Sequence, residues 1–229
     1  MGQMELFEEN GNTTDDATFA SCLMNGFDVP PDLSGLFELS VDAYYAVIHA
    51  AMSGLPIKGE ICRFIEKVSR AGDRAAAELA ASDRGDGDVL AVLRAAYKVT
   101  VEIHRLTGLL RFSPDQAGVY IARCCPDYFI LPALAEHFTL RFGETPWAII
   151  DEKRKLCLQS DNGAPARLIA LSPSDPLATA AVNKAGDSWE GLWRLYHRSV
   201  NNETRNNRRL QRQFMPERYH EYLPEMKKP

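Results

Sequence analysis

The sequence predicts an α+β fold, and three features of the chain lead to this prediction. Apolar residues recur at helical spacing up to Leu106, short β-type apolar runs follow Gly108, and helical spacing returns from Ser188 onward. We therefore expect N-terminal helices, a small central antiparallel sheet with one packed helix, and a helical C-terminal tail. The chain has 229 residues, of which 45% are hydrophobic, so it is long enough to bury a sizeable core.

The expected organisation is an acidic lead-in over residues 1–35 and a single α+β domain over residues 36–229. The lead-in shows no sustained apolar period, so we expect it to be only partly ordered. Changes of pattern divide the domain into a helical part 36–107, a sheet region 108–171, a linker 172–187 and a basic helical tail 188–229.

Start and stop signals place the first helices. Ser40 is a suitable N-cap for a helix over residues 41–52, which Gly54 ends. A second stretch of helical spacing covers residues 57–81 and breaks at residues 71–73.

The longest predicted helix follows. Asp86 or Asp88 caps it, and Gly108 is its expected stop. Its continuous apolar face consists of Val89, Val92, Leu93, Ala96, Val99, Ile103 and Leu106.

Short apolar runs after Gly108 predict the strands. A helix over about residues 132–142, closed by Gly143, interrupts them. The expected strands are residues 109–112, 119–124, 147–150, 156–159 and 167–171.

Charge is unevenly distributed along the chain. Residues 1–57 contain nine acids and no Lys or Arg, whereas Trp193 to Glu225 concentrates arginines among amides and aromatic rings. Either a polyanionic partner binds the basic tail or the two ends of the chain meet, and both interpretations remain open at this point.

Several classes of protein are excluded by what the sequence lacks. No apolar run approaches the roughly 20 residues that cross a bilayer, and the N-terminus has no basic region followed by an apolar core, so we expect no export signal. The five cysteines include no C-x-x-C spacing, which favours reduced thiols in the cytoplasm over disulfides or a metal site. Phosphate-loop, dinucleotide, hydrolase-elbow, zinc-protease, zinc-deaminase and radical-SAM cysteine motifs are absent, so we predict no cofactor.

The first candidate site follows the longest helix. His104 and Arg105 end that helix, and Arg111 follows on the first expected strand. Two guanidiniums beside an imidazole suit a phosphate or carboxylate, with His104 as a candidate catalytic residue for proton transfer. The structural alternative is that Arg105 pairs with Glu102 and His104 caps helix carbonyls.

The second candidate site combines a helix face with a turn. His137 and Arg141 are four residues apart and therefore share a helix face, and Asp151 and Arg154 follow in a turn. Asp151 either orients an imidazole as general base, which makes His137 and Asp151 catalytic candidates, or forms a salt bridge to Arg154. Arg141 and Arg154 are candidate phosphate ligands.

The third candidate site is the C-terminal tail. Arg205, Asn206, Arg208 and Gln211 offer donors suited to phosphate or base edges, and Tyr219 is placed to stack on a base. The alternative is a helical tail fixed to the domain by arginine pairs, with its aromatic residues in a core.

Four motifs in this order resemble one uncharacterised bacterial family over roughly residues 36–225. That family is described as a probable DNA-metabolism protein, encoded beside a radical-SAM protein and in some members fused to a uracil-DNA glycosylase domain. The motifs are His104-Arg105-x-x-Gly108-x-x-Arg111-Phe112, His137-Phe138-x-x-Arg141-Phe142, Trp147-x-Ile149-x-Asp151-x-x-Arg154, and Arg205-Asn206-x-x-x-Leu210-Gln211-x-x-Phe214-Met215-Pro216-x-x-Tyr219.

The resemblance implies DNA repair or modification together with a radical-SAM partner, with DNA and a uracil-DNA glycosylase-like protein as further partners. It implies no assigned reaction and no catalytic residue. The family usually has Tyr-Trp where this chain has Tyr219-His220, so the resemblance carries no stacking role over to the second position.

The leading hypothesis is a cytoplasmic protein that binds nucleic acid or another phosphate-bearing ligand through an Arg/His site and acts with a radical-SAM partner. One alternative is a non-catalytic adaptor or scaffold for that partner. The other is an enzyme acting on a small phosphorylated substrate. Whether the protein is an enzyme stays open.

Overall fold

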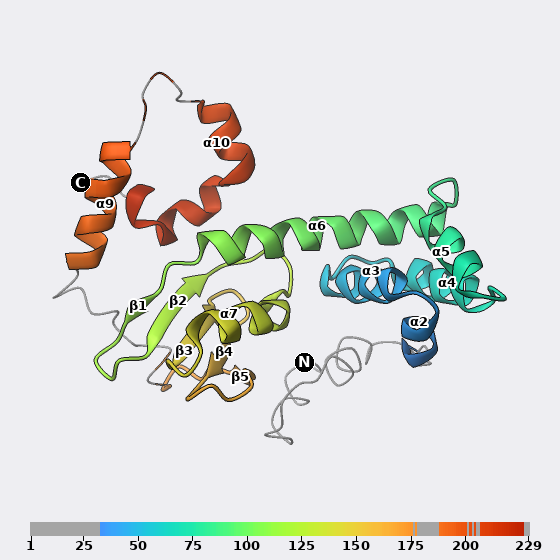
Figure 1. Cartoon of the computed structure of the whole chain (residues 1–229), viewed down its shortest axis with the longest axis horizontal. Helices are drawn as coiled ribbons and strands as arrows, with labels where there is room; N and C mark the ends of the chain where they lie inside the picture. The colour runs from blue at the N-terminus through green and yellow to red at the C-terminus, as the bar shows by residue number, and fades with distance from the viewer. Residues whose placement is uncertain are drawn as a thin grey trace. The chain divides into compact units, whose positions relative to one another are not determined.

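The computed structural model describes residues 33–175, 177, 188–200, 202, 204 and 207–226 (Figure 1). The predicted lead-in up to residue 32 and most of the predicted linker lie outside the described residues. The described chain forms two compact units. The helical unit contains residues 33–103 and Asp127–Ile130, and the sheet unit contains His104–Pro126 and the described residues from Leu131 onward. The mixed helix and sheet content confirms the predicted α+β class.

The helical unit contains one helix that begins at the predicted cap Ser40 and one whose cap, Asp73, was predicted only as part of a break in the helical pattern. The Ser40 hydroxyl accepts a hydrogen bond from the Ala43 N–H at 3.2 Å, and an Asp73 carboxylate oxygen accepts one from the Ala76 N–H at 2.9 Å. Gly54 ends the second helix with a φ of 63°, which favours glycine. The helices are α2 (Leu33–Leu39), α3 (Val41–Met52), α4 (Lys58–Ser69), α5 (Arg74–Ser82) and the first part of α6 (Gly87–Leu109).

Leu93 and Ile103 of the predicted α6 face are only half-buried, but the core of the helical unit contains apolar side chains from each of its helices. Its helices bury these side chains almost completely, which removes apolar surface from water and is the main term that stabilises the unit. The fully buried members are Leu36, Val47, Phe64, Val68, Ala77, Val89, Val92 and Val99.

The helix α6 is capped by Asp86, whose Oδ1 accepts from the N–H groups of Asp88 at 2.8 Å and Val89 at 3.1 Å. Of the two predicted caps, Asp86 and Asp88, the structure therefore has Asp86. The predicted stop at Gly108 is wrong, because α6 continues to Leu109. The predicted strand over residues 109–112 is also wrong, because residue 109 belongs to α6 and residues 110–112 are in neither a helix nor a strand, and the strand β1 comprises only Ser113–Pro114.

The sheet unit contains a five-stranded sheet in the order β1-β2-β3-β4-β5. Three of its pairings are antiparallel, as predicted, but β2 and β3 are parallel. The chain between β2 and β3 passes through η2 (Leu131–Leu134) and α7 (Ala135–Phe142), and this crossover returns it to the same end of the sheet. The remaining strands are β2 (Tyr120–Cys124), β3 (Trp147–Asp151), β4 (Leu156–Ser160) and β5 (Arg167–Ala170).

The strand β3 lies in the centre of the sheet, and all five of its residues are buried. On one face, Trp147 packs against Phe138 and Phe142 of α7, with ring centroids 6.1 and 6.2 Å apart. Alternate residues form a second cluster that includes Ile150 and Cys157. The pKa of Cys157 is raised to about 12, mainly by burial and to a smaller extent by the charge of Asp175, so its thiol stays protonated.

The C-terminal elements of the sheet unit are helical, as predicted. They are α9 (Ser188–Val200), α10 (Arg208–Phe214), η5 (Glu217–Tyr222) and η6 (Pro224–Met226). Among the described cysteines, Cys62, Cys124, Cys125 and Cys157 are free thiols. No helix in the described ranges has the length and apolar character needed to cross a membrane.

Candidate functional site

Arg111 lies where α6 leads into β1, and the C-terminal segment holds its guanidinium. Nη2 donates to Oε1 of Glu225 at 2.7 Å, and Nη1 donates to the carbonyl of Gly108 at 2.8 Å. The indole Nε1 of Trp193 donates to the second Glu225 oxygen, Oε2, at 3.1 Å. The Arg111 guanidinium also lies 5.5 Å from the centroid of the Trp193 ring. We call Arg111, Trp193 and Glu225 the clasp.

The clasp encloses an ionised carboxylate. The Glu225 side chain is 2% exposed, and that of Arg111 is 27% exposed. Burial acts to raise the pKa of Glu225. The pKa nevertheless lies below its usual range, because the carboxylate accepts hydrogen bonds from the backbone, Arg111 and Trp193 and is attracted by the charge of Arg111. Arg111 is therefore paired with the protein, although the sequence also predicted it as a phosphate ligand.

The guanidinium of Arg105 is also held by the C-terminal segment, through a backbone carbonyl. Its Nη2 donates to the carbonyl of Gln213 at 2.9 Å, which connects the end of α6 to α10. The predicted pair between Arg105 and Glu102 is not formed, because Glu102 accepts backbone N–H groups from Asp127 at 2.9 Å and Tyr128 at 2.8 Å. His104 is exposed, and its carbonyl accepts a hydrogen bond from the Thr107 hydroxyl.

The helix α7 separates its aromatic residues from its polar ones. Phe138 and Phe142 contact Phe112, with ring centroids 5.1 and 4.7 Å apart. His137 and Arg141, four residues apart, are both exposed. The predicted placement of these two polar residues on one helix face is therefore confirmed, and both side chains are accessible to a ligand.

Asp151 ends β3 and organises the turn that follows. Its carboxylate accepts the N–H groups of Lys153 at 2.9 Å and Arg154 at 3.1 Å, and its Oδ2 is 2.8 Å from Nη1 of Arg154. That Nη1 also donates to the carbonyl of Pro126 at 3.1 Å. Of the two alternatives for Asp151, the salt bridge is therefore observed, and no imidazole is among its partners in the described part of the chain.

The predicted residues of the tail fall into different surroundings. Arg205 and Asn206 lie outside the described residues. Arg208 is exposed at the start of α10, and Nε2 of Gln211 lies 3.8 Å from the sulfur of Met226. Tyr219 is 1% exposed, so it is a core residue and not an accessible stacking platform.

A polar network in the same unit was not predicted from the sequence. The Tyr222 hydroxyl donates to Oε2 of Glu152 at 2.8 Å, and Nη1 of Arg123 lies 3.4 Å from Oε1. Burial, followed by the hydrogen bond to Glu152, raises the pKa of Tyr222, so the phenol stays a donor. Glu225 was also missed. The partners in both groups, Tyr222 with Glu152 and Glu225 with Arg111, are far apart in the chain, so no local spacing in the sequence indicates their contact.

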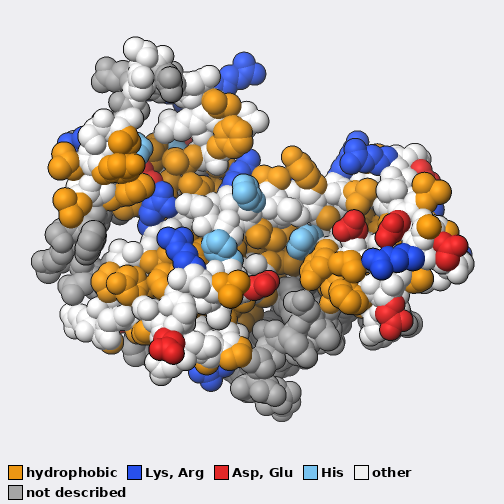
Figure 2. Space-filling view, viewed as in Figure 1, with side chains coloured by type: hydrophobic (Ala, Val, Ile, Leu, Met, Phe, Trp, Pro, Cys, Tyr) orange, Lys and Arg blue, Asp and Glu red, His pale blue; other side chains and the backbone are white. Residues whose placement is uncertain are grey.

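The helices α9 and α10 expose both arginines and large apolar side chains (Figure 2). Tyr196 is 57% exposed and Phe214 is 63% exposed, which is unusual for aromatic rings in a packed unit. We call these side chains together the α9–α10 surface. Its members are Leu192, Trp193, Leu195, Tyr196, Arg198, Val200, Arg208, Arg209, Leu210, Arg212 and Phe214.

The arginines of the α9–α10 surface differ from those of the clasp region. Within the described residues, Arg198, Arg208 and Arg209 have no ion pair, and Arg212 pairs with Glu217 at 2.9 Å where both side chains are about two-thirds exposed. No group of three or more His, Cys, Asp or Glu side chains in the described part of the chain is arranged to hold a metal ion. The accessible side chains of the α9–α10 surface are therefore arginines, aromatic rings and aliphatic groups.

One comparison with known proteins gives a match. A family model described as a domain of unknown function, DUF4130, matches residues 58–225. No curated protein and no solved structure matches the chain.

Proposed function

The chain belongs to the DUF4130 family of domains of unknown function, whose model covers the whole clasp and the α9–α10 surface, and we propose that this surface binds single-stranded nucleic acid. The single observation that carries the proposal is the exposure of arginines together with aromatic rings on α9 and α10. Guanidinium groups bind phosphate, and aromatic faces stack on unpaired bases of any sequence. Bases within a duplex present only their edges, so exposed rings favour a single strand.

Two of the predicted residues, Arg208 and Arg111, have a part in this proposal. Arg208 contacts the phosphate backbone together with Arg198 and Arg209, and Tyr196 and Phe214 stack on bases. The clasp fixes α9 through the hydrogen bond between Trp193 and Glu225, so Arg111 acts by holding the surface in place.

The exposed pair His137 and Arg141 of α7 is a second place for a phosphate. His104 and His137 are the candidate proton-transfer groups if the protein is an enzyme. Both imidazoles are exposed and therefore accessible to a substrate.

We further propose that the protein acts in DNA repair or modification together with a radical-SAM protein. The resemblance carried by the four sequence motifs supports this part of the proposal. A cytoplasmic location is part of the same proposal.

Salt-dependent binding tests the proposal. A fluorescent single-stranded DNA of about 20 nucleotides should bind at 50 mM salt and lose affinity steeply towards 200 mM, with a log–log slope of about −0.7 for each phosphate contacted. The double variant Arg208→Ala/Arg209→Ala should reduce the magnitude of that slope by about 1 to 2. Tyr196→Ala should weaken binding roughly 5-fold to 150-fold with little change in slope.

The matched control is Arg94→Ala, which removes an exposed arginine from α6 in the helical unit. It should bind DNA as the natural chain does. The proposal is wrong if no DNA binds at 50 mM salt, or if Arg94→Ala and the double variant weaken binding equally.

A second function is favoured by the apolar members of the same surface. Leu192, Leu195 and Val200 are each more than half exposed, and contiguous exposed apolar residues are typical of protein docking sites. The alternative is therefore an adaptor that docks its radical-SAM partner on α9. In that case Leu195→Glu abolishes co-purification of the two proteins, and DNA binding is absent.

A further inference from the structure

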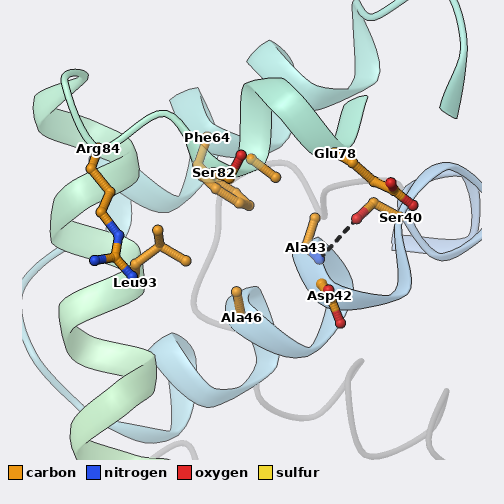
Figure 3. Close-up of a pocket in the computed structure, with 10 residues that line it drawn as sticks. Ser40, Asp42, Ala43, Ala46, Phe64, Glu78, Ser82, Arg84 and Leu93 are labelled. Carbon is orange, nitrogen blue, oxygen red and sulfur yellow. Dashed lines mark hydrogen bonds between the residues drawn. The ribbon is translucent and has the colours of Figure 1, made fainter. Parts of the chain in front are cut away.

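A cavity of about 240 Å³ lies within the helical unit, between α3, α4, α5 and the start of α6 (Figure 3). Its floor is apolar and contains Phe64, Ala43, Ala46 and Ala81. The cavity exists because α5 is rich in alanine, and alanines of α3 face it. Methyl groups on both sides leave a space that longer side chains would fill.

Charged side chains of opposite sign lie at opposite ends of this cavity. Figure 3 shows Asp42 of α3 and Glu78 of α5 at one end, and Arg84 at the other end beside Leu93 of α6. Glu78 has an exposed pairing with Arg74 at 3.3 Å, which is weak in water. The cavity thus has an acidic end, an apolar middle and a basic end.

The turn that carries Arg84 is held in place by α4. Lys67 bridges Asp83 at 3.0 Å and Asp86 at 2.9 Å. Arg63 binds Asp88 with two hydrogen bonds of 2.8 Å each.

The acids of the turn are therefore neutralised by α4 and not by Arg84. Among the described residues, Arg84 has no ion pair of its own. Because these pairs hold the backbone of the turn, a ligand has only the Arg84 side chain to order, which favours binding.

From this arrangement we propose that the cavity binds a small zwitterion whose ammonium group faces Asp42 and Glu78 and whose carboxylate faces Arg84. The aliphatic middle of the ligand packs over Phe64 and the alanines. A volume of about 240 Å³ is below the roughly 300–1,000 Å³ of sites for drug-sized ligands, so the ligand is about the size of an amino acid. The guanidinium fork matches a carboxylate with two parallel hydrogen bonds.

The probe for this site is 6-aminohexanoate, with hexanoate and hexylamine as controls that each keep one charge. In a ¹H–¹⁵N NMR titration of the full chain, 6-aminohexanoate should shift the amide resonances of Ala43, Ala81 and Ser82 with a Kd in the millimolar range or below. Hexanoate and hexylamine should each bind at least 10-fold more weakly. The proposal is overturned if all three compounds bind alike or if 6-aminohexanoate causes no shifts.

Variants separate the cavity from the general charge of the surface. Arg84→Gln should raise the Kd for 6-aminohexanoate at least 10-fold, whereas Arg94→Gln, an exposed arginine of α6 that does not line the cavity, should leave it unchanged. Ala81→Leu should abolish binding by filling the cavity, and the same spectra report whether this variant is folded. If Ala81→Leu does not fold, Arg84→Gln decides alone. Equal Kd values for Arg84→Gln and Arg94→Gln overturn the proposal.

Discussion

Two arginine–glutamate pairs in the sheet unit have similar lengths and different surroundings. Arg111 lies 2.7 Å from Glu225 in the clasp, and Arg212 lies 2.9 Å from Glu217 beside α10. The Glu225 side chain is 2% exposed, whereas that of Glu217 is 66% exposed. The buried carboxylate depends on its partner to stay charged, but water solvates the exposed one whether or not the arginine is present.

This difference shows which arginines of the sheet unit are structural. A buried pair fixes a geometry, and its guanidinium is occupied. An exposed pair exchanges readily with water, salt or a phosphate group, so its arginine remains available to a ligand. The number of arginines in the sequence therefore overestimates the binding surface, and burial of the partner separates the two kinds.

The largest expected effect is that of Arg111→Ala. This variant leaves the Glu225 carboxylate buried without its cation, so we expect a loss of about 2–4 kcal/mol in the free energy of unfolding, below the full value for a buried pair because Arg111 is partly exposed. Urea unfolding measures it. The matched control, Arg209→Ala, removes an exposed arginine and should change the same free energy by less than about 0.5 kcal/mol. Equal losses in the two variants would contradict the structural role of the clasp.

A pH series sharpens the comparison through Glu225. Its pKa lies below the ordinary value of 4.5 in the folded chain, so ionised Glu225 stabilises the fold above that pH, and this contribution is lost as the pH falls through the depressed pKa. At pH 7 we expect Glu225→Gln to be less stable than the natural chain by roughly 1–3 kcal/mol. The difference should shrink as the pH is lowered below 4.5.

The control for this series is Glu217→Gln, which neutralises the exposed carboxylate. Its difference from the natural chain should stay small at every pH. A constant difference between Glu225→Gln and the natural chain across the series would show that the Glu225 charge does not stabilise the fold.

Local patterns in the sequence predicted most of the helices and strands. The cap at Ser40, most of the apolar face of α6 and the turn at Gly143 depend on neighbours within a few residues, and these features were correctly predicted. The parallel pairing of β2 with β3 depends on where a helix returns the chain, so strand patterns alone did not reveal it.

The candidate site was predicted less completely, because its contacts join distant parts of the chain. Arg111 and Glu225 are 114 residues apart, and nothing near either residue signals the pair. Asp151 and Arg154 are three residues apart, and their salt bridge was among the predicted alternatives. A tyrosine is suited both to a protein core and to a surface that stacks on bases. The sequence position of Tyr219 therefore could not show which of these two roles it has.

The smallest expected effect on stability is that of Arg212→Ala. Since both partners of its pair are about two-thirds exposed, its removal should cost at most about 0.5 kcal/mol in urea unfolding. If α10 binds nucleic acid as proposed, the same variant should still reduce the magnitude of the salt slope for single-stranded DNA by about 0.7, because a phosphate competes with Glu217 for the guanidinium. A loss of more than 1 kcal/mol in stability would mean that exposure does not separate structural arginines from available ones. Unchanged stability together with an unchanged salt slope would remove Arg212 from the proposed surface and leave Arg198, Arg208 and Arg209 as its cations.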